Sequence, residues 1–283
     1  MSTAWLRRRI AQGPPLVCPG AANALAARVI EDSGFEACYV TGAGIANTYL
    51  GAPDLGLVTL TELAGHVAAI RDAVALPLVV DADTGFGNPL GVQRAVRMLE
   101  RAGADAVQIE DQVHPKRCGH FGGKEVVPVG EMVAKVRAAV DARRDLLVIA
   151  RTDARAVEGF DAAIDRAARY AEAGADVTFV EAPTSVEELL AVPRRLPGVP
   201  QVANLVEGGR TPALPVDRLG DFRIVLFANL ALQGAVLGMR RVLSTLRSTG
   251  SLSEAAADVA GWEERQRLVR KPAFDELEKR YES

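Results

Sequence analysis

Residues 116–120 read Lys-Arg-Cys-Gly-His and gather two cations, a thiol and an imidazole shortly after the carboxylates of Glu110 and Asp111. Nearby cations lower the pKa of a thiol, because they favour the thiolate over the neutral form. Cys118 is therefore a candidate for acid–base chemistry on a short polar loop. A glycine-containing loop with a chance cysteine would look the same, so the surrounding elements must decide.

Carboxylates at two neighbouring strand ends predict a divalent-cation site. Asp81 and Asp83 are two residues apart in an extended segment, so their side chains point to the same side. With Glu110 from the next predicted strand they form an oxygen-rich group, which Mg²⁺ or Mn²⁺ prefers and zinc does not. The alternative is a metal-free site in which Arg151 and Lys116 relieve the repulsion among the carboxylates.

A second set of residues is suited to anions. Arg151 ends a predicted strand, and its guanidinium can bind a planar carboxylate through two hydrogen bonds. Thr41, with the backbone N–H groups of Gly42 and Ala43, can hold another carboxylate. A divalent cation beside such groups favours a 2-oxo-acid or its enolate as ligand, because the cation stabilises an enolate as a Lewis acid. Cys118 could then deliver or remove a proton.

Short apolar runs that alternate with helical patterns must position these residues. The runs lack strict alternation, as do strands buried on both faces of a parallel sheet. They lie at residues 16–19, 37–41, 78–81, 106–110, 146–151, 177–181, 201–204 and 224–227. Helical patterns lie at 22–33, 60–74, 90–101, 129–143, 160–173, 186–196, 214–219 and 230–248, and several end at a glycine.

Eight strand–helix units in about 250 residues predict an α/β fold, a single (β/α)8 TIM barrel. A doubly wound open sheet is the alternative, but no Gly-x-Gly-x-x-Gly motif follows a strand. We expect one barrel domain over residues 1–283, with 252–283 as a C-terminal helical extension. Trp262, Leu268 and Phe274 give this extension an apolar face, either for its own barrel or for a neighbouring subunit.

The barrel brings polar residues from six strands to one end, where the active sites of such barrels lie. They are Thr41 and Gly42, Asp81 and Asp83, Glu110 and Asp111, Arg151 and Asp153, Glu181, and Asn204 with Glu207. A single acidic strand end is commonly a helix N-cap, which is what we expect of Asp153. Six such ends at one mouth predict a functional site.

Composition narrows the class of protein. The chain has 283 residues, a net charge of −3 and three cysteines. This charge gives no reason to expect binding to nucleic acid or to a membrane surface. No apolar run approaches the roughly 18 residues of a membrane helix. Cys18 and Cys38 lie in apolar runs, and neither a disulfide framework nor a Cys-x-x-Cys motif is indicated. We expect a cytoplasmic protein.

Several motifs together resemble the isocitrate lyase/phosphoenolpyruvate mutase superfamily, over nearly the whole chain. They lie at residues 41–44, 50–56, 81–87, 109–112, 116–120, 150–154 and 204–209. The Lys-Arg-Cys-Gly-His segment at 116–120 is the most specific, because it marks the carbon–carbon lyase branch. That branch includes methylisocitrate lyase, 2,3-dimethylmalate lyase and carboxyphosphonoenolpyruvate mutase. The segment argues against branches without this cysteine, such as phosphoenolpyruvate mutase and phosphonopyruvate hydrolase.

The resemblance implies a Mg²⁺-dependent lyase, with Mn²⁺ as a possible substitute. Such an enzyme cleaves a 2-hydroxy dicarboxylate, of the 2-alkylmalate or methylisocitrate type, through an enolate. The products are an oxo-acid, pyruvate or glyoxylate, and a carboxylic acid. The family also implies a last barrel helix that is swapped between subunits, in dimers that assemble into a homotetramer.

The same resemblance implies roles for individual residues. Asp81 would bind the metal, with Asp83, Asp54 and Glu110 acting directly or through water. Substrate would be bound by Tyr39, Thr41, Gly42, Ala43, Gly119, Arg151 and Asn204. Cys118 would protonate the enolate from a loop that closes over the substrate, with Glu181 and His120 assisting and Lys116 biasing the thiol.

Departures from the family patterns leave the substrate open. Methylisocitrate lyases commonly end the eighth strand in Tyr-Pro-Leu-Ser and carry an arginine a few residues on. Here Ala228 and Asn229 interrupt that pattern, and Gln233 stands where the arginine would fall. The lost cation argues against a tricarboxylate, because a buried unpaired carboxylate is costly. Glu-Gly-Gly at 207–209 is more similar to dimethylmalate lyase or a phosphonomutase. A carboxyphosphonoenolpyruvate phosphonomutase and a non-catalytic oxo-acid-binding barrel are the alternatives.

Overall fold

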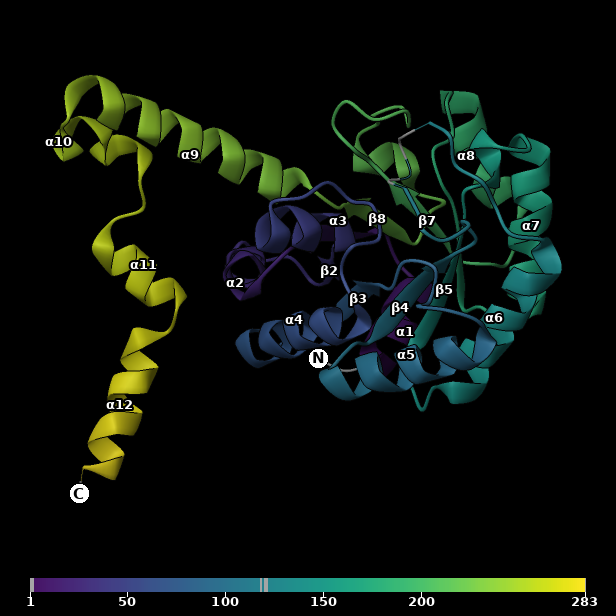
Figure 1. Ribbon diagram of the computed structural model, residues 1–283, viewed down its shortest axis with the longest axis horizontal. Helices are drawn as coiled ribbons and strands as arrows, with labels where there is room; N and C mark the ends of the chain where they lie inside the picture. The colour runs from purple at the N-terminus through teal and green to yellow at the C-terminus, as the bar shows by residue number, and fades with distance from the viewer. Residues whose placement is uncertain (1–2, 118, 120–121, 283) are drawn as a thin grey trace.

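The eight apolar runs form eight parallel strands that pair in chain order and close into a barrel, with β1 against β8 (Figure 1). The computed structural model describes residues 3–117, 119 and 122–282. The strands are β1 (Leu16–Ala21), β2 (Cys38–Val40), β3 (Leu78–Asp81), β4 (Ala106–Glu110), β5 (Leu147–Thr152), β6 (Val177–Val180), β7 (Gln201–Asn204) and β8 (Ile224–Phe227). The TIM barrel is confirmed, and the open-sheet alternative is wrong.

The helices follow the predicted patterns to within a few residues. They are α2 (Ala24–Asp32), α4 (Leu60–Ala73), α5 (Pro89–Ala102), α6 (Val129–Ala142), α7 (Phe160–Glu172), α8 (Val186–Arg195) and α9 (Leu230–Thr249). The expected helix at 214–219 is a 3₁₀ turn, η3 (Val216–Leu219). The helices α5 and α9 end at a left-handed glycine, Gly103 with φ 106° and Gly250 with φ 65°, because glycine adopts this conformation without steric cost.

A helix that the sequence reading missed, α1 (Thr3–Ala11), closes the amino-terminal end of the barrel. Its Thr3 binds Asp105, and its Arg7 binds Asp176, each just before a strand. Leu6 and Ile10 join the apolar cluster that fills the barrel interior. The opposite end, at the carboxyl termini of the strands, is therefore where the chain can place chemistry.

Beyond β8 the chain leaves the barrel as an arm (Figure 1). It consists of α9, α10 (Leu252–Ala255), η4 (Ala256–Asp258), α11 (Trp262–Leu268) and α12 (Lys271–Tyr281). The stretch that we expected to be a helical extension holds α10, η4, α11 and α12. Arg267 of α11 binds Asp32 of α2, so the arm contacts its own barrel. No helix in the described ranges is long and apolar enough to cross a membrane.

Candidate active site

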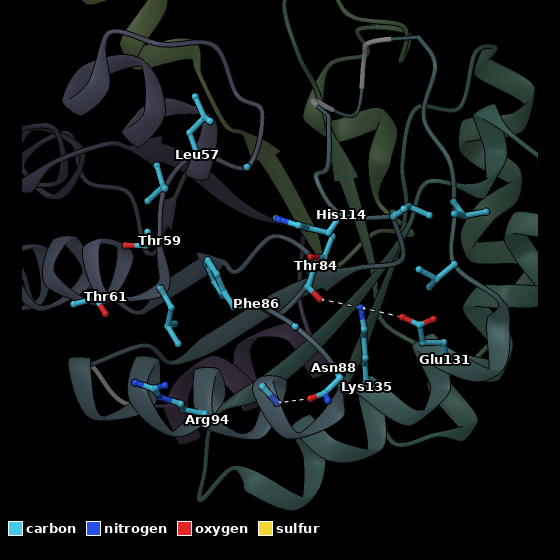
Figure 2. A pocket seen from close by; sticks show the side chains of 18 of the residues that line it. Leu57, Thr59, Thr61, Thr84, Phe86, Asn88, Arg94, His114, Glu131 and Lys135 are labelled. Carbon is cyan, nitrogen blue, oxygen red and sulfur yellow. Dashed lines mark hydrogen bonds and ion pairs between the residues drawn. The ribbon is translucent and has the colours of Figure 1, made fainter.

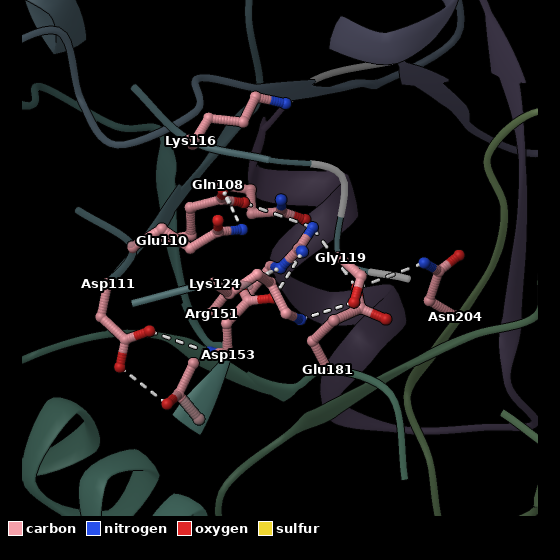
Figure 3. A network of polar contacts seen from close by, with 12 residues as sticks. Gln108, Glu110, Asp111, Lys116, Gly119, Lys124, Arg151, Asp153, Glu181 and Asn204 are labelled. Atoms are coloured by element: carbon pink, nitrogen blue, oxygen red, sulfur yellow. Dashed lines mark hydrogen bonds and ion pairs between the residues drawn. The ribbon is translucent and has the colours of Figure 1, made fainter. Parts of the chain in front are cut away.

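The strand ends bring most of the predicted site residues to one mouth of the barrel, as Figure 3 shows for β4 to β7. Arg151 occupies the centre, with Glu110 on one side and Glu181 on the other. Asn204 follows at the end of β7, and its Nδ2 donates to Glu181 Oε2 at 3.3 Å. Asn204 Oδ1 is buried and accepts no hydrogen bond from the described residues, so it is available to a ligand.

Arg151 is held in a fixed orientation by its neighbours. Its Nε and Nη2 donate to the two carboxylate oxygens of Asp153 at 2.9 and 3.0 Å. Its Nη1 lies 3.3 Å from both Glu110 and Glu181, and its guanidinium carbon lies 5.3 Å from the ring centre of Phe179. Burial alone would lower the pKa of Arg151, but the three carboxylates raise it well above its ordinary value. The guanidinium is thus a permanent charge.

Asp153 does not act as the side-chain cap that we expected from the sequence. It precedes the turn η2 (Ala154–Ala156), yet its carboxylate makes no capping hydrogen bond. It binds Arg151 instead, and it accepts from Lys124 Nζ at 2.6 Å. Burial opposes ionisation, but Arg151 and then Lys124 overcome it and lower the pKa of Asp153 to about 2. The carboxylate of Asp153 therefore pairs with two buried cations and does not cap the following turn.

The four predicted metal ligands surround one buried cation, Lys116. Its Nζ lies 2.6 Å from both carboxylate oxygens of Asp54 and 2.9 Å from Asp83 Oδ1. Burial alone would lower the pKa of Lys116, but Asp83, Glu110, Asp81 and Asp54 raise it well above its ordinary value. The charge compensation that we considered from the sequence is therefore present for Lys116.

The donor chemistry of these carboxylates fits Mg²⁺, because all four offer hard oxygen atoms. Asp83 Oδ1 is buried and pairs with Lys116 Nζ at 2.9 Å, so the ammonium would have to leave before this oxygen could coordinate a cation. In that same part of the chain, no three Asp, Glu, His or Cys side chains already converge closely enough to hold a metal ion. Burial raises the pKa of Asp83 to about 6; Lys116 opposes the rise, whereas Asp81 and Asp54 add to it.

Glu110 is a second carboxylate with altered acidity. It is 1% exposed, and burial raises its pKa well above the ordinary value despite the nearby charges of Arg151 and Lys116. Gln112 Nε2 donates to Glu110 Oε1 at 2.9 Å and to the Arg117 carbonyl at 2.8 Å. The Arg117 N–H in turn donates to Gln112 Oε1 at 3.0 Å. Gln112 therefore ties the start of the cysteine loop to the site.

The turn after β2 lies directly beside the carboxylates of Asp81 and Asp83. Thr41 caps the short helix α3 (Gly42–Ile45) by accepting from the Gly44 N–H, and its hydroxyl lies 3.1 Å from Asn229 Oδ1. A Cβ added at Gly42 would lie 3.3 Å from Asp81 Oδ2, so only glycine leaves free space there. The N–H groups at 42 and 43 begin this helix, as the anion-site hypothesis needs.

Tyr39 is linked to the carboxylate of Asp81 by hydrogen bonds through Gln108. Its hydroxyl donates to Gln108 Oε1 at 3.2 Å, and Gln108 Nε2 lies 3.4 Å from Asp81 Oδ1. Burial, reinforced by the charge of Asp81, raises the pKa of Tyr39 well above its ordinary value. The tyrosine is therefore a neutral hydrogen-bonding group, and its predicted role in binding substrate stays a prediction.

The cysteine loop is described on both sides of its central residues. Cys118 and His120 lie outside the described residues, so their predicted roles stay predictions. Gly119 packs on the site, since a Cβ there would fall 2.3 Å from Arg151 Nη2 and 2.8 Å from Glu181 Cγ. Its carbonyl accepts from Lys124 Nζ at 2.5 Å.

Sequence reasoning missed Lys124, Gln112 and Gln108 as members of this network. All three are buried polar side chains, exposed by at most 8%. Gln108 and Gln112 flank Glu110 at alternating positions, a spacing that could have signalled side chains on its face. No local signal marks Lys124, because its partners are set by the loop and by the next strand.

Two cavities flank the mouth without occupying it. One of about 940 Å³ lies outside the barrel between the starts of α4, α5 and α6 (Figure 2). Its walls include Thr84, His114 and Lys135. It is the larger of the two, but it touches none of the charged residues around Arg151. The other, of about 340 Å³, is lined by Asn229 and Gln233 among others, so these unusual residues face open space beside Thr41.

Comparison with known proteins agrees with this geometry. The family model described as phosphoenolpyruvate phosphomutase matches residues 6–247. A 2-methylisocitrate lyase of Aeropyrum pernix is 47% identical over 87% of this chain and 80% of its own length. The 2,3-dimethylmalate lyase of Eubacterium barkeri is 39% identical over 99% of this chain and 98% of its own. A phosphonopyruvate hydrolase structure with oxalate and Mg²⁺ superimposes with a TM-score of 0.90 at 31% identity, covering all of both chains.

Proposed function

The chain belongs to the phosphoenolpyruvate mutase/isocitrate lyase superfamily, and we propose that it is a Mg²⁺-dependent carbon–carbon lyase. It would cleave the C2–C3 bond of a 2-hydroxy dicarboxylate, of the 2-alkylmalate type, to an oxo-acid and a carboxylic acid. The observation that carries the proposal is the pairing of a fixed, buried Arg151 with the carboxylate group around Lys116. One part suits a substrate carboxylate and the other a divalent cation.

Asp81, with Asp83, Asp54 and Glu110, would hold Mg²⁺. When bound, the cation supplies Lewis-acid stabilisation of the enolate that cleavage generates. Support comes from the hard oxygen donors of the site and from the relative whose structure contains Mg²⁺ and oxalate. Lys116 would change partners on metal binding, because it bridges Asp54 and Asp83 in the structure.

Cleavage requires two proton transfers, and the chain offers a group for each. The C2 hydroxyl loses its proton to a base, the C2–C3 bond breaks, and its electron pair passes to the carboxylate-stabilised enolate at C3. Glu110 would take the role of base, because its carboxylate is buried at the mouth, 3.3 Å from Arg151 Nη1. Cys118 would then protonate C3, and Thr41, Gly42, Ala43, Asn204 and Arg151 would hold the substrate oxygens, with Tyr39, Glu181 and His120 in support.

The residues beside the smaller cavity favour a dicarboxylate over a tricarboxylate. Gln233 and Asn229 line it and carry no charge, so a third carboxylate would lie there without a cation. A 2-alkyl group needs none. A methylisocitrate-type substrate is therefore the weaker form of the proposal, although the relative from Aeropyrum pernix bears that name.

The test is a substrate panel assayed with and without EDTA. Purified protein should release pyruvate or another oxo-acid from one or more 2-alkylmalates, and EDTA should abolish the release until Mg²⁺ is restored. Phosphonates followed by phosphorus NMR form the second arm, because Glu-Gly-Gly at 207–209 is also similar to a phosphonomutase. Turnover of a phosphonate alone would replace the lyase proposal. Mg²⁺-dependent oxalate binding with no turnover would indicate a non-catalytic barrel.

The proposal extends to assembly and location. We propose a single barrel domain with residues 252–283 as a helical extension, in a homotetramer of helix-swapped dimers in the cytoplasm. The exposed apolar arm supports the assembly, because none of the residues of α9 is buried in the single chain. No nucleic-acid or membrane partner is proposed.

A further inference from the structure

Lys124 is a buried cation with a conspicuous pair of contacts. Its side chain is 1% exposed, and its Nζ donates to Asp153 Oδ1 at 2.6 Å and to the Gly119 carbonyl at 2.5 Å. Burying an ammonium group is costly, and an apolar side chain of the same length would serve packing equally well. We therefore expect the positive charge of Lys124 to act through the two groups that it binds.

Both acceptors of Lys124 abut Arg151. Asp153 binds the guanidinium through two hydrogen bonds, at Nε and at Nη2. Gly119 lies so close to the same guanidinium that a Cβ would meet Nη2 at 2.3 Å. One ammonium thus holds two groups that abut Arg151, the carboxylate of Asp153 and the backbone of Gly119 (Figure 3).

The charges around Arg151 explain why a second cation is needed. Three buried carboxylates, Glu110, Asp153 and Glu181, surround this single guanidinium. Lys124 Nζ and Arg151 Nη2 both donate to Asp153 Oδ1, so Lys124 neutralises part of the negative charge of Asp153. Asp153 can therefore orient Arg151 without neutralising the whole positive charge of the guanidinium. Nη1 makes its two contacts at 3.3 Å, longer than those of Nε and Nη2, so a substrate carboxylate would compete for it with Glu110 and Glu181 and not with Asp153.

We propose that Lys124 is a positioning residue, which holds Asp153 and the Gly119 backbone so that Arg151 meets a carboxylate of the substrate. This role deepens the proposed function and rests on it for the identity of the ligand of Arg151. Lys124 itself does not touch the substrate.

The experiment compares Lys124→Met with Lys135→Met. Lys135 is also a buried lysine, on α6, but its contacts are longer, at 3.4 Å to the Thr84 carbonyl and 3.5 Å to Glu131. It controls for the loss of any buried ammonium. Circular dichroism and thermal melting first establish that both variants fold.

Kinetics separate positioning from stability. An arginine that binds a substrate carboxylate binds ground and transition state alike, so its misplacement raises KM and leaves kcat largely unchanged. Lys124→Met should raise KM at least tenfold, roughly the effect of losing one charge-assisted hydrogen bond. Lys135→Met should keep the wild-type KM. A merely structural Lys124 would lower the active fraction, and hence apparent kcat, at constant KM, which would overturn the proposal.

A double-mutant cycle tests the route through Asp153. Asp153→Asn should raise KM, and adding Lys124→Met should raise it little further, because both changes disturb one chain of contacts. Fully additive effects would contradict that route.

A spectroscopic readout makes the outcome independent of the substrate. The ¹⁵N-labelled Nε–H of Arg151, identified by its loss in Arg151→Lys, should be protected from exchange in the wild type. It should shift and exchange faster in Lys124→Met but not in Lys135→Met. If the wild type turns over no panel member, the proposed function fails while this comparison still decides whether Lys124 positions Arg151. An unchanged signal would overturn its role.

Discussion

Asp83 is a partly buried, charged residue and a predicted metal ligand. Its backbone is left-handed, with φ 48°, which an aspartate tolerates better than most residues but adopts only under constraint. This turn places Oδ1 2.9 Å from Lys116 Nζ, so the two side chains form an ion pair. A divalent cation at this site would take the place of the ammonium, because both compete for the same carboxylate oxygen.

The pH dependence of stability should report on Asp83. Burial raises its pKa from 3.8 to about 6, so the folded metal-free protein binds the proton more tightly than the unfolded chain. The stability linked to this group is fully present below about pH 4 and is lost as pH rises through about 6. Between pH 4.5 and 7.5, urea unfolding of EDTA-treated wild type should show a fall in stability that is smaller in Asp83→Asn. An identical fall in both proteins would show that Asp83 does not carry the effect.

Cys118 is the residue on which the proposed chemistry depends. Replacement by serine keeps the size but raises the pKa of the proton donor by several units, so Cys118→Ser should lower turnover at least ~100-fold. Substrate affinity should change little. Arg117→Ala, which alters an exposed neighbour in the same loop, should retain most activity. Steady-state kinetics on the best panel substrate decides, and near wild-type turnover in Cys118→Ser would reject the acid–base role.

The loops and strand ends determine how closely these groups approach one another. Gly119 shows this for the cysteine loop, since a Cβ added there would lie 2.3 Å from Arg151 Nη2. Arg151 cannot yield freely, because Asp153 holds two of its nitrogens. A larger residue at 119 must therefore displace either the loop or the arginine.

Gly119→Ala should accordingly impair activity without unfolding the protein. We expect kcat/KM to fall about 100-fold, the scale of a displacement near 1 Å at a reacting centre. Gly122→Ala is the matched control, because a Cβ there meets nothing within 4 Å. Equal activities of the two variants would show that the described packing of Gly119 is not needed for catalysis.

The sequence predicted the elements well where the pattern was local. Buried parallel strands appear as apolar runs, so the strands and the polar residues at their ends followed directly. The helix α1 was missed because three arginines among its nine residues conceal its apolar face. Lys124 was missed and Asp153 was misread because the ion pair that joins them spans 29 residues of sequence. A lysine destined for burial looks in sequence like one on the surface.

At the scale of the whole molecule, the arm is the part of the chain whose apolar side chains the barrel leaves exposed. Val236, Met239, Leu243 and Leu246 of α9 are 40 to 62% exposed and recur at helical spacing, so they form one apolar stripe. Such a stripe marks an interaction surface in a soluble protein. The barrel of the same chain does not cover it, and we propose that a second copy does.

Leu243→Glu should therefore reduce the oligomeric state. A carboxylate in the middle of the stripe would have to be buried unpaired in the assembly, which is costly, whereas it costs nothing on a free helix. Analytical ultracentrifugation should find the variant largely as a monomer at concentrations where the wild type is a tetramer. Ser248→Glu adds the same charge five residues on, on the other side of α9, and should leave the assembly intact. A wild type that sediments as a monomer, or a Leu243→Glu variant that sediments like the wild type, would contradict the proposed packing of α9.

If assembly is lost while activity per chain persists, the site is complete within one barrel. If activity is lost with it in Leu243→Glu but not in Ser248→Glu, the neighbouring copy contributes to the mouth that Arg151 and Lys116 define.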